Sequence, residues 1–233
     1  MSNDLTRRGF LGVAGAGAVA ASTAAVAGED NASTGPIKIV GIACSHRKGK
    51  STAESMRYCL EAAKAVDPKR IETELIELAG LKINGAVAAG VELEPGERDD
   101  FPAVAAKLAE PNVAAMIIGT PVYFSNMSSL CKAFLERLVV FRKDDFALSN
   151  MVAGVLAVGG SRNGGQELTV ESVKASLYAQ EMIIVGESRP TAHYGPAVWN
   201  KKGLKSVTDD TVGMKAVANL GRRVSEVAQL VRK

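Results

Sequence analysis

Short apolar runs alternate with segments of helical periodicity over most of the chain. The apolar runs predict five β-strands, at residues 37–43, 71–78, 114–119, 151–158 and 182–185. Apolar residues at spacings of three and four predict helices beginning near Ser51, at residues 99–110, 128–141 and 166–178, and from about Asp209. Continuous apolar strands separated by amphipathic helices are typical of a parallel sheet covered on both faces. Five such strands suit a doubly wound α/β domain better than an eight-stranded barrel.

Composition excludes several classes of protein. The 233 residues carry a formal net charge of +3, with 47% hydrophobic and 23% charged residues, as in an ordinary globular protein. This charge is too small and too evenly spread for a nucleic-acid-binding face, so we expect no nucleic-acid partner. Three cysteines, Cys44, Cys59 and Cys131, are too few for a disulfide framework and match no metal-ligand spacing.

The first residues form a segment of their own. Arg7 and Arg8 precede Gly-Phe-Leu, an Ala/Gly-rich apolar run follows at residues 12–27, and Ala25-Val26-Ala27 fits a cleavage site. The segment resembles a twin-arginine export signal; the alternative is a disordered alanine-rich tail. We expect a signal peptide at residues 1–27, a linker at 28–36, a single domain at 37–233 and a periplasmic or other extracytoplasmic location. The apolar run is shorter than the ~20 residues of a membrane span, so no stable membrane anchor is expected.

The loop after the first strand has the composition of an anion site. Ligands of open parallel sheets bind beyond the carboxyl ends of the strands, so the loops after strands one, three and four are the candidates. Hydroxyls, basic side chains and free amides at the start of the next helix suit a phosphate. A nucleotide-binding P-loop needs glycine where this chain has Cys44, so a monophosphate held by Ser45, Arg47, Ser51 and Thr52 fits better. The alternative is an ordinary polar loop whose helix is capped by a Ser51–Glu54 capping box.

The other two loops are rich in aromatic residues and in glycine. Tyr123 and Phe124 are adjacent aromatics just past the third strand, and they either lie under a flat ligand or turn inward into the core. After the fourth strand, residues 159–165 contain four glycines, which allow a backbone to approach a ligand closely or simply make the loop flexible.

In this order, the three loops resemble those of the flavodoxin-like flavin reductases, and the resemblance extends from Ile37 to the end of the chain. It is strongest to the branch that contains NADPH-dependent FMN reductases and iron–sulfur flavoproteins. Its motifs include Ser-x-Arg-x-Gly-x-Ser-Thr at residues 45–52, Gly-x-Pro-Val-Tyr-Phe at 119–124 with Lys-Ala-Phe-Leu-Glu-Arg at 132–137, and Gly-Gly-Gln-Glu at 164–167. The resemblance implies a flavodoxin-like five-stranded sheet of order 2-1-3-4-5, with helices on both faces, that binds FMN. The residues implied to bind FMN are Ser45, Arg47, Gly49, Ser51, Thr52, Pro121, Val122, Tyr123, Phe124, Asn126, Gly160, Ser161, Gly164 and Gly165.

One departure from the family concerns the iron–sulfur cluster. Iron–sulfur flavoproteins carry a run of cysteines in the connection after strand two, but this chain has no cysteine between Cys59 and Cys131. Because a [4Fe–4S] cluster needs thiolate ligands, we expect neither a cluster nor another metal.

The resemblance implies an FMN-dependent NAD(P)H oxidoreductase that takes electrons from NADPH or NADH and passes them to a quinone, flavin or metal acceptor. No catalytic acid or base is assigned. Alternatives are an exported electron carrier with a redox protein partner, or a relative without cofactor. The resemblance also implies a homodimer or homotetramer, with contacts at the helix after Ser128 and at the connection 79–98.

Four further residues are candidates for chemistry. Cys44, beside basic residues at a helix start, is either a reactive thiolate or a small packing residue. His46 and His193 lie in predicted loops with no carboxylate evident nearby. Trp199 either packs against the domain or lies in a loop that covers a flavin or contacts a partner.

Overall fold

The structure is a computed structural model that describes residues 35–201 and 207–232. The predicted signal peptide and most of the predicted linker lie outside the described residues. Within the part of the chain that is described, no helix has both the length and the apolarity that crossing a membrane requires.

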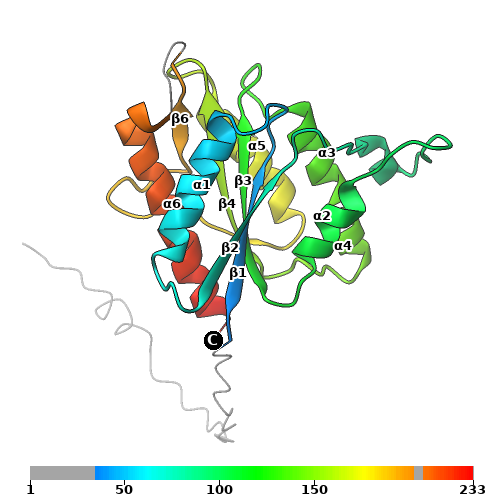
Figure 1. Ribbon diagram of the computed structural model, residues 1–233, viewed down its shortest axis with the longest axis horizontal. Helices are drawn as coiled ribbons and strands as arrows, with labels where there is room; N and C mark the ends of the chain where they lie inside the picture. Colours follow the sequence, from blue (N-terminus) through cyan, green and yellow to red (C-terminus); the bar gives the residue numbers. More distant parts are fainter. Residues whose placement is uncertain (1–34, 202–206, 233) are drawn as a thin grey trace, which may run out of the picture. The chain divides into compact units, whose positions relative to one another are not determined.

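The apolar runs form a parallel sheet with the predicted topology. Its strands are β1 (Ile37–Ala43), β2 (Ile71–Glu77), β3 (Val113–Pro121), β4 (Val152–Gly159) and β5 (Ile183–Ile184), in the order β2-β1-β3-β4-β5 (Figure 1). All neighbouring pairs are parallel. Every residue of β3 and β4 is buried, which explains why these strands read as continuous apolar runs. The predicted flavodoxin-like fold is confirmed.

The edge of the sheet beside β4 differs from the prediction. Strand β5 has only two residues and pairs with Val152 and Ala153, while a sixth strand, β6 (Ala197–Trp199), pairs with β4 from Ala157 to Gly159. The segment between β5 and β6 leaves the sheet and closes tightly on itself. A Cβ added to Gly186 would lie 2.4 Å from the carbonyl oxygen of His193. Two short strands therefore share the position that one predicted strand was expected to fill.

Helices cover both faces of the sheet (Figure 1). Helices α1 (Ser51–Lys64) and α6 (Thr211–Val231) pack on one face. The other face carries α2 (Phe101–Leu108), α3 (Ser129–Arg137), α4 (Val139–Lys143) and α5 (Gln166–Tyr178). The predicted helix 128–141 is thus two helices that meet at Leu138, and short 3₁₀ helices lie at η2 (Gly85–Ala89) and η3 (Val207–Asp209).

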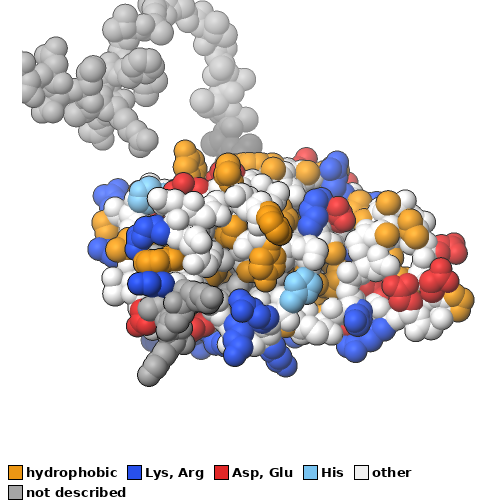
Figure 2. Space-filling model, turned by 90° about the horizontal axis from the view of Figure 1, so that it is seen from above, with side chains coloured by type: hydrophobic (Ala, Val, Ile, Leu, Met, Phe, Trp, Pro, Cys, Tyr) orange, Lys and Arg blue, Asp and Glu red, His pale blue; other side chains and the backbone are white. Residues whose placement is uncertain are grey.

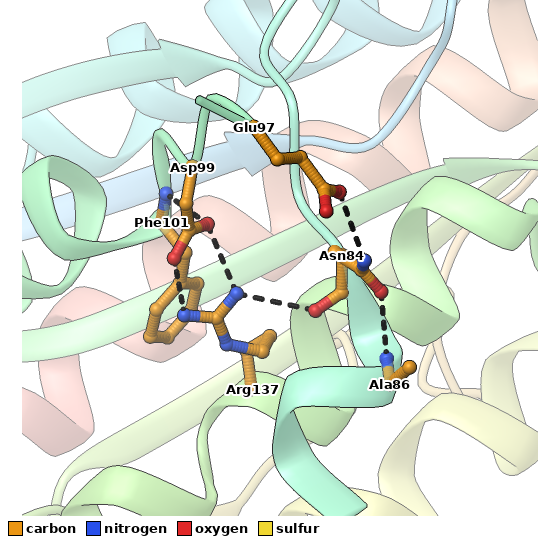
Figure 3. Close-up of polar contacts among 6 residues, drawn as sticks. All are labelled: Asn84, Ala86, Glu97, Asp99, Phe101 and Arg137. Atoms are coloured by element: carbon orange, nitrogen blue, oxygen red, sulfur yellow. Dashed lines mark hydrogen bonds and ion pairs between the residues drawn. The ribbon is translucent and has the colours of Figure 1, made fainter. Parts of the chain in front are cut away.

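The long connection 79–98 is attached to α3 by a buried arginine (Figure 3). The Arg137 guanidinium donates to both carboxylate oxygens of Asp99, at 2.9 and 2.7 Å, and to the carbonyl oxygen of Asn84 at 3.1 Å. It also lies 4.6 Å from the ring centroid of Phe101. The side chains of Arg137 and Asp99 are only 5% and 11% exposed. One side chain of α3 therefore holds both ends of the connection.

Candidate functional site

The three candidate loops meet beyond the carboxyl ends of β1, β3 and β4. Figure 2 looks onto this edge, where hydrophobic side chains gather near the centre with Lys and Arg side chains around them. The Ser128 hydroxyl donates to the carbonyl oxygen of Cys44 at 2.6 Å, which joins the first loop to the second. The backbone amide of Val122 donates to the carbonyl oxygen of Val158 at 3.0 Å, which joins the second to the end of β4. The loops singled out from the sequence are therefore neighbours in space.

Helix α1 begins at the first loop without a side-chain cap. Its N-cap is Lys50, whose side chain makes no capping hydrogen bond, and Ser51 is the first helical residue. The predicted Ser51–Glu54 capping box is therefore wrong, because Ser51 lies one position inside the helix. Amides in the first turn of a helix have no partner within it, and the helix dipole adds partial positive charge. An uncapped helix start is suited to an anion.

The predicted phosphate-binding side chains are close together but differ in exposure. Ser45 and Thr52 are buried, Ser51 is half-buried and Arg47 is exposed. The Ser45 hydroxyl accepts from the Arg47 amide at 3.1 Å and so shapes the loop. The Ser51 hydroxyl lies 3.2 Å from Asn200 Nδ2, which donates to it. The site thus includes a residue from just after β6.

Gly49 has a structural task in the same loop. Its backbone is left-handed, with φ +66°, and its amide donates to Glu77 Oε2 at 2.7 Å. The other Glu77 oxygen accepts from Arg57 at 2.6 Å. The amide of Gly49 is therefore used within the protein, and its contribution to an anion site is the turn that its backbone allows.

The two adjacent aromatics lie at the tip of a tight turn. The amide of Tyr123 donates to the carbonyl oxygen of Asn126 at 2.8 Å, and the amide of Asn126 returns a bond of 3.0 Å. Between them, Phe124 and Ser125 have φ +50° and +59°, the pattern of a type I′ turn. Phe124 is fully exposed and Tyr123 is 42% exposed, so the inward-facing alternative is wrong. A bulky residue held in a left-handed conformation is typical of functional sites.

The glycine-rich loop packs against this turn. Gly165 has φ +95°, and a Cβ added to it would lie 2.6 Å from Ser125 Cα. The Gln166 side chain is buried; it accepts from the amide of Gly164 at 2.8 Å and donates to the carbonyl oxygen of Ser161 at 2.7 Å. Gly160 has no atom within 4 Å of an added Cβ. The loop therefore has a defined shape, held by a glutamine, and an open side at Gly160.

The sequence interpretation missed several polar contacts around these loops. Glu77 and Asn200 bind the first loop as described, and the Arg162 guanidinium lies 4.3 Å from the ring centroid of Trp199. His46 Nε2 lies 3.2 Å from the Ser129 hydroxyl. The signal for Glu77 was its place at the end of a strand, where ligand-facing loops begin. Asn200 gave no signal, because β6 was not predicted.

The structure gives the surroundings of the cysteines and of His193. Cys44 is fully buried, and burial together with neighbouring Cys131 raises the pKa of its thiol well above the ordinary value. The reactive-thiolate alternative is therefore wrong, and Cys44 is a packing residue. Burial raises the pKa of Cys59 to about 12. His193 does have a carboxylate neighbour, because its Nδ1 lies 3.1 Å from Glu187 Oε1.

Comparisons with known proteins identify relatives of this chain. The iron-sulfur flavoprotein MJ1083 of Methanocaldococcus jannaschii is 36% identical over 200 residues, which cover 84% of this chain and 100% of the relative. An NAD(P)H dehydrogenase (quinone) of Archaeoglobus fulgidus is 32% identical over 171 residues, covering 70% of this chain and 78% of the relative.

A solved structure shows the same fold. The flavodoxin, WrbA-like protein from Agrobacterium tumefaciens aligns with a TM-score of 0.58 at 16% identity, over 84% of this chain and 98% of that one. The family model of NADPH-dependent FMN reductases matches residues 37–196, which include β1 to β5 and all three loops. The chain belongs to the NADPH-dependent FMN reductase family.

Proposed function

We propose that the protein is an FMN-dependent NAD(P)H oxidoreductase whose flavin lies across the three loops. The observation that carries this proposal is the uncapped start of the 14-residue helix α1 beside an exposed aromatic turn. Family membership and the NAD(P)H dehydrogenase (quinone) relative support the same activity.

The residues present fit both ends of FMN, its phosphate and its flat ring. For its phosphate, the chain offers the first-turn amides of α1, the hydroxyls of Ser45, Ser51 and Thr52, and the charge of Arg47. For its flat ring, residues 121–126 offer a protruding aromatic turn, and Gly160 offers backbone with no side chain nearby. The supporting contact between Gly165 and Ser125 keeps the two ring-binding loops at a fixed separation.

FMN, when bound, supplies the hydride and electron chemistry of such an enzyme. The chain's own residues bind and orient it. The phosphate-binding residues fix one end, and Gln166 fixes the shape of the glycine-rich loop at the other. Tyr123 and Phe124 exclude water from the ring that they cover. We assign no protein acid or base to the reaction.

The first test is an absorption spectrum of the purified protein before and after anaerobic addition of NADPH and then NADH. Flavin bands that bleach with a nicotinamide support the reductase. Flavin bands that bleach only with dithionite would favour the alternative electron carrier. A protein that neither contains nor takes up FMN would contradict both functions.

The phosphate end is tested with Arg47→Ala. We expect the Kd for FMN to rise roughly tenfold, because a hydrogen bond to a charged group contributes about 1.5–3 kcal/mol. The thermal midpoint should not change, since Arg47 is exposed. Arg223→Ala, which removes an equal charge from α6, is the control and should leave the Kd for FMN unchanged.

We propose that no iron–sulfur cluster is present, although several relatives are named iron-sulfur flavoproteins. The chain has three cysteines in all, and a [4Fe–4S] cluster held by cysteines alone requires four. All three thiols are buried within the domain. Iron and sulfide analysis of the purified protein should find neither in stoichiometric amounts.

We also propose that residues 1–27 direct export by the twin-arginine route, on the evidence of Arg7, Arg8 and the Ala-Val-Ala cleavage pattern. Cell fractionation should find a shortened protein outside the cytoplasm, and Arg7→Lys with Arg8→Lys should retain the uncleaved chain inside. Equal distribution of both forms would contradict export. Assembly as a homodimer or homotetramer stays a prediction, to be checked by light scattering.

A further inference from the structure

Asn200 follows β6 directly and connects two of the candidate loops. Its backbone amide donates to the carbonyl oxygen of Gly159 at 2.8 Å, where β4 ends and the glycine-rich loop begins. Its side-chain Nδ2 donates to the Ser51 hydroxyl at 3.2 Å, at the first residue of α1. Asn200 therefore ties the start of α1 to the end of β4.

The backbone around Asn200 is held by the sheet and by α6. Trp199, the residue before it, pairs with Gly159 in the parallel ladder between β6 and β4. The amide of Trp199 also donates at 2.7 Å to Asp210, the N-cap of α6. The side chain of Asn200 is short and half-buried. Its contact with Ser51 is therefore formed in the protein itself, before a ligand binds.

This contact determines what the Ser51 hydroxyl can do. A serine hydroxyl has one hydrogen to donate and two lone pairs that accept. Because Asn200 Nδ2 donates to the oxygen, one lone pair is used and the hydrogen is left for another group. A hydroxyl that accepts in this way is also polarised towards stronger donation. Asn200 therefore makes Ser51 a hydrogen-bond donor towards a ligand.

Ser45 shows the same arrangement in the first loop. Its hydroxyl accepts from the Arg47 amide at 3.1 Å, which again leaves the hydroxyl hydrogen to donate. An ionised phosphate offers acceptor oxygens, so each hydroxyl that binds them must donate. Two hydroxyls of the site thus have an oxygen lone pair occupied from within the protein, one by the loop itself and one by a residue beyond β6. This pairing suits a ligand group that only accepts hydrogen bonds.

We propose that Asn200 is a positioning residue for phosphate recognition: it fixes the Ser51 hydroxyl as a donor to the FMN phosphate, and so favours FMN over riboflavin, which has no phosphate. The inference rests on the proposed function, since it takes FMN as the ligand of the three loops. The family model matches residues 37–196, so Asn200 lies beyond the matched segment and the match assigns it no role.

The test is titration of the full-length protein, freed of bound flavin, with FMN and with riboflavin, followed by flavin fluorescence. Asn200→Ala should raise the Kd for FMN about fivefold, as for the loss of one neutral hydrogen bond, and the Kd for riboflavin by less than about twofold. Asn200→Asp should raise the Kd for FMN at least about thirtyfold, because its carboxylate accepts the Ser51 hydrogen and repels the phosphate.

A double-mutant cycle separates this role from a general structural one. If Asn200 acts through Ser51, Asn200→Ala should weaken FMN binding no further in a chain that already carries Ser51→Ala. The control is Asn112→Ala. Asn112 is half-buried like Asn200, but it lies just before β3, at the opposite edge of the sheet. Its replacement should leave the Kd values for both flavins unchanged.

Three results would overturn the proposal. These are an unchanged Kd for FMN in Asn200→Ala, equal losses of FMN and riboflavin affinity, and additive effects of the Ser51 and Asn200 replacements. Equal losses would mean that Asn200 only supports the fold around the loops. In each of these cases the unchanged protein still binds FMN, and the proposed function stands. An unchanged protein that binds neither flavin would contradict the proposed function and this inference together.

Discussion

Phe124 combines two properties that seldom occur together: a left-handed backbone and a fully exposed aromatic ring. Type I′ turns favour asparagine and glycine at this position, and a bulky residue there costs of order 1–3 kcal/mol. Because the ring is exposed, its packing within the described chain does not offset this conformational cost. We infer that the position is retained for what the ring contacts outside the domain.

Replacing Phe124 tests this conflict between stability and binding. Phe124→Asn should raise the free energy of unfolding by about 1 kcal/mol, because asparagine tolerates the left-handed region. Phe124→Val should lower it, since β-branched residues tolerate that region least. Both variants should bind FMN more weakly. Urea unfolding and FMN titration measure the two effects, and equal stability of the variants would contradict the strain.

The thiols provide a second test at the residue scale. Burial raises the pKa of Cys44 and of Cys59, the latter to about 12, so both stay protonated at pH 8. We expect no reaction of the native protein with a thiol reagent at that pH, and three equivalents after unfolding. Rapid labelling of one thiol in the native protein would contradict the packing role of Cys44.

At the scale of elements, a buried ion pair attaches the connection 79–98 to α3. Arg137 lowers the pKa of Asp99 by direct hydrogen bonding, so folding favours the ionised carboxylate. The stabilisation is present above the ordinary pKa of an aspartate and is lost as the pH falls through the lowered value. The connection 79–98 should therefore loosen first on acidification.

Removing one partner of the pair should show its importance. Asp99→Ala leaves Arg137 buried without a counter-charge and should cost about 3 kcal/mol of unfolding free energy. The control is Lys132→Ala on the same helix, which removes an exposed pair with Glu136 and should change stability by less than about 0.5 kcal/mol. Equal effects on thermal or urea unfolding would mean that the pair is not what holds the connection.

The elements also show how far a local pattern predicts structure. Strands β1, β3 and β4 were predictable because both of their faces are buried, which requires continuous apolar runs. The edge shared by β5 and β6 was not, because strands of two and three residues give no periodicity. The break in 128–141 at Leu138 was also invisible, since the apolar spacing continues through it.

At the scale of the molecule, the two proposed ring-binding loops rest on each other. Gly165→Ala would place a Cβ 2.6 Å from Ser125 Cα at a φ of +95°, so the loops must separate. We expect a lower thermal midpoint and at least a tenfold rise in the Kd for FMN. Gly160→Ala is the matched control, because an added Cβ at Gly160 has no atom within 4 Å.

The matched variant should leave the thermal midpoint unchanged. Any loss of FMN affinity in Gly160→Ala would then report a ligand lying close to Gly160. If Gly165→Ala bound FMN normally, the contact between the loops would have no part in the site.

The site as a whole was only partly predictable. The three loops could be named from the sequence because each follows an apolar strand and has an unusual composition. Their mutual contacts could not, since Glu77 and Asn200 contact residues too distant along the chain for a local pattern to encode. The Ser51–Asn200 contact joins residues 149 positions apart.

That one contact has a consequence for the order in which the protein is made. Ser51 belongs to α1, the first of the described helices, and Asn200 follows only after all six described strands have been synthesised. Contacts so distant along the chain form late in folding. A growing chain therefore presents an unfinished first loop until its last quarter emerges, and full affinity for a phosphate-bearing ligand belongs to the completed polypeptide.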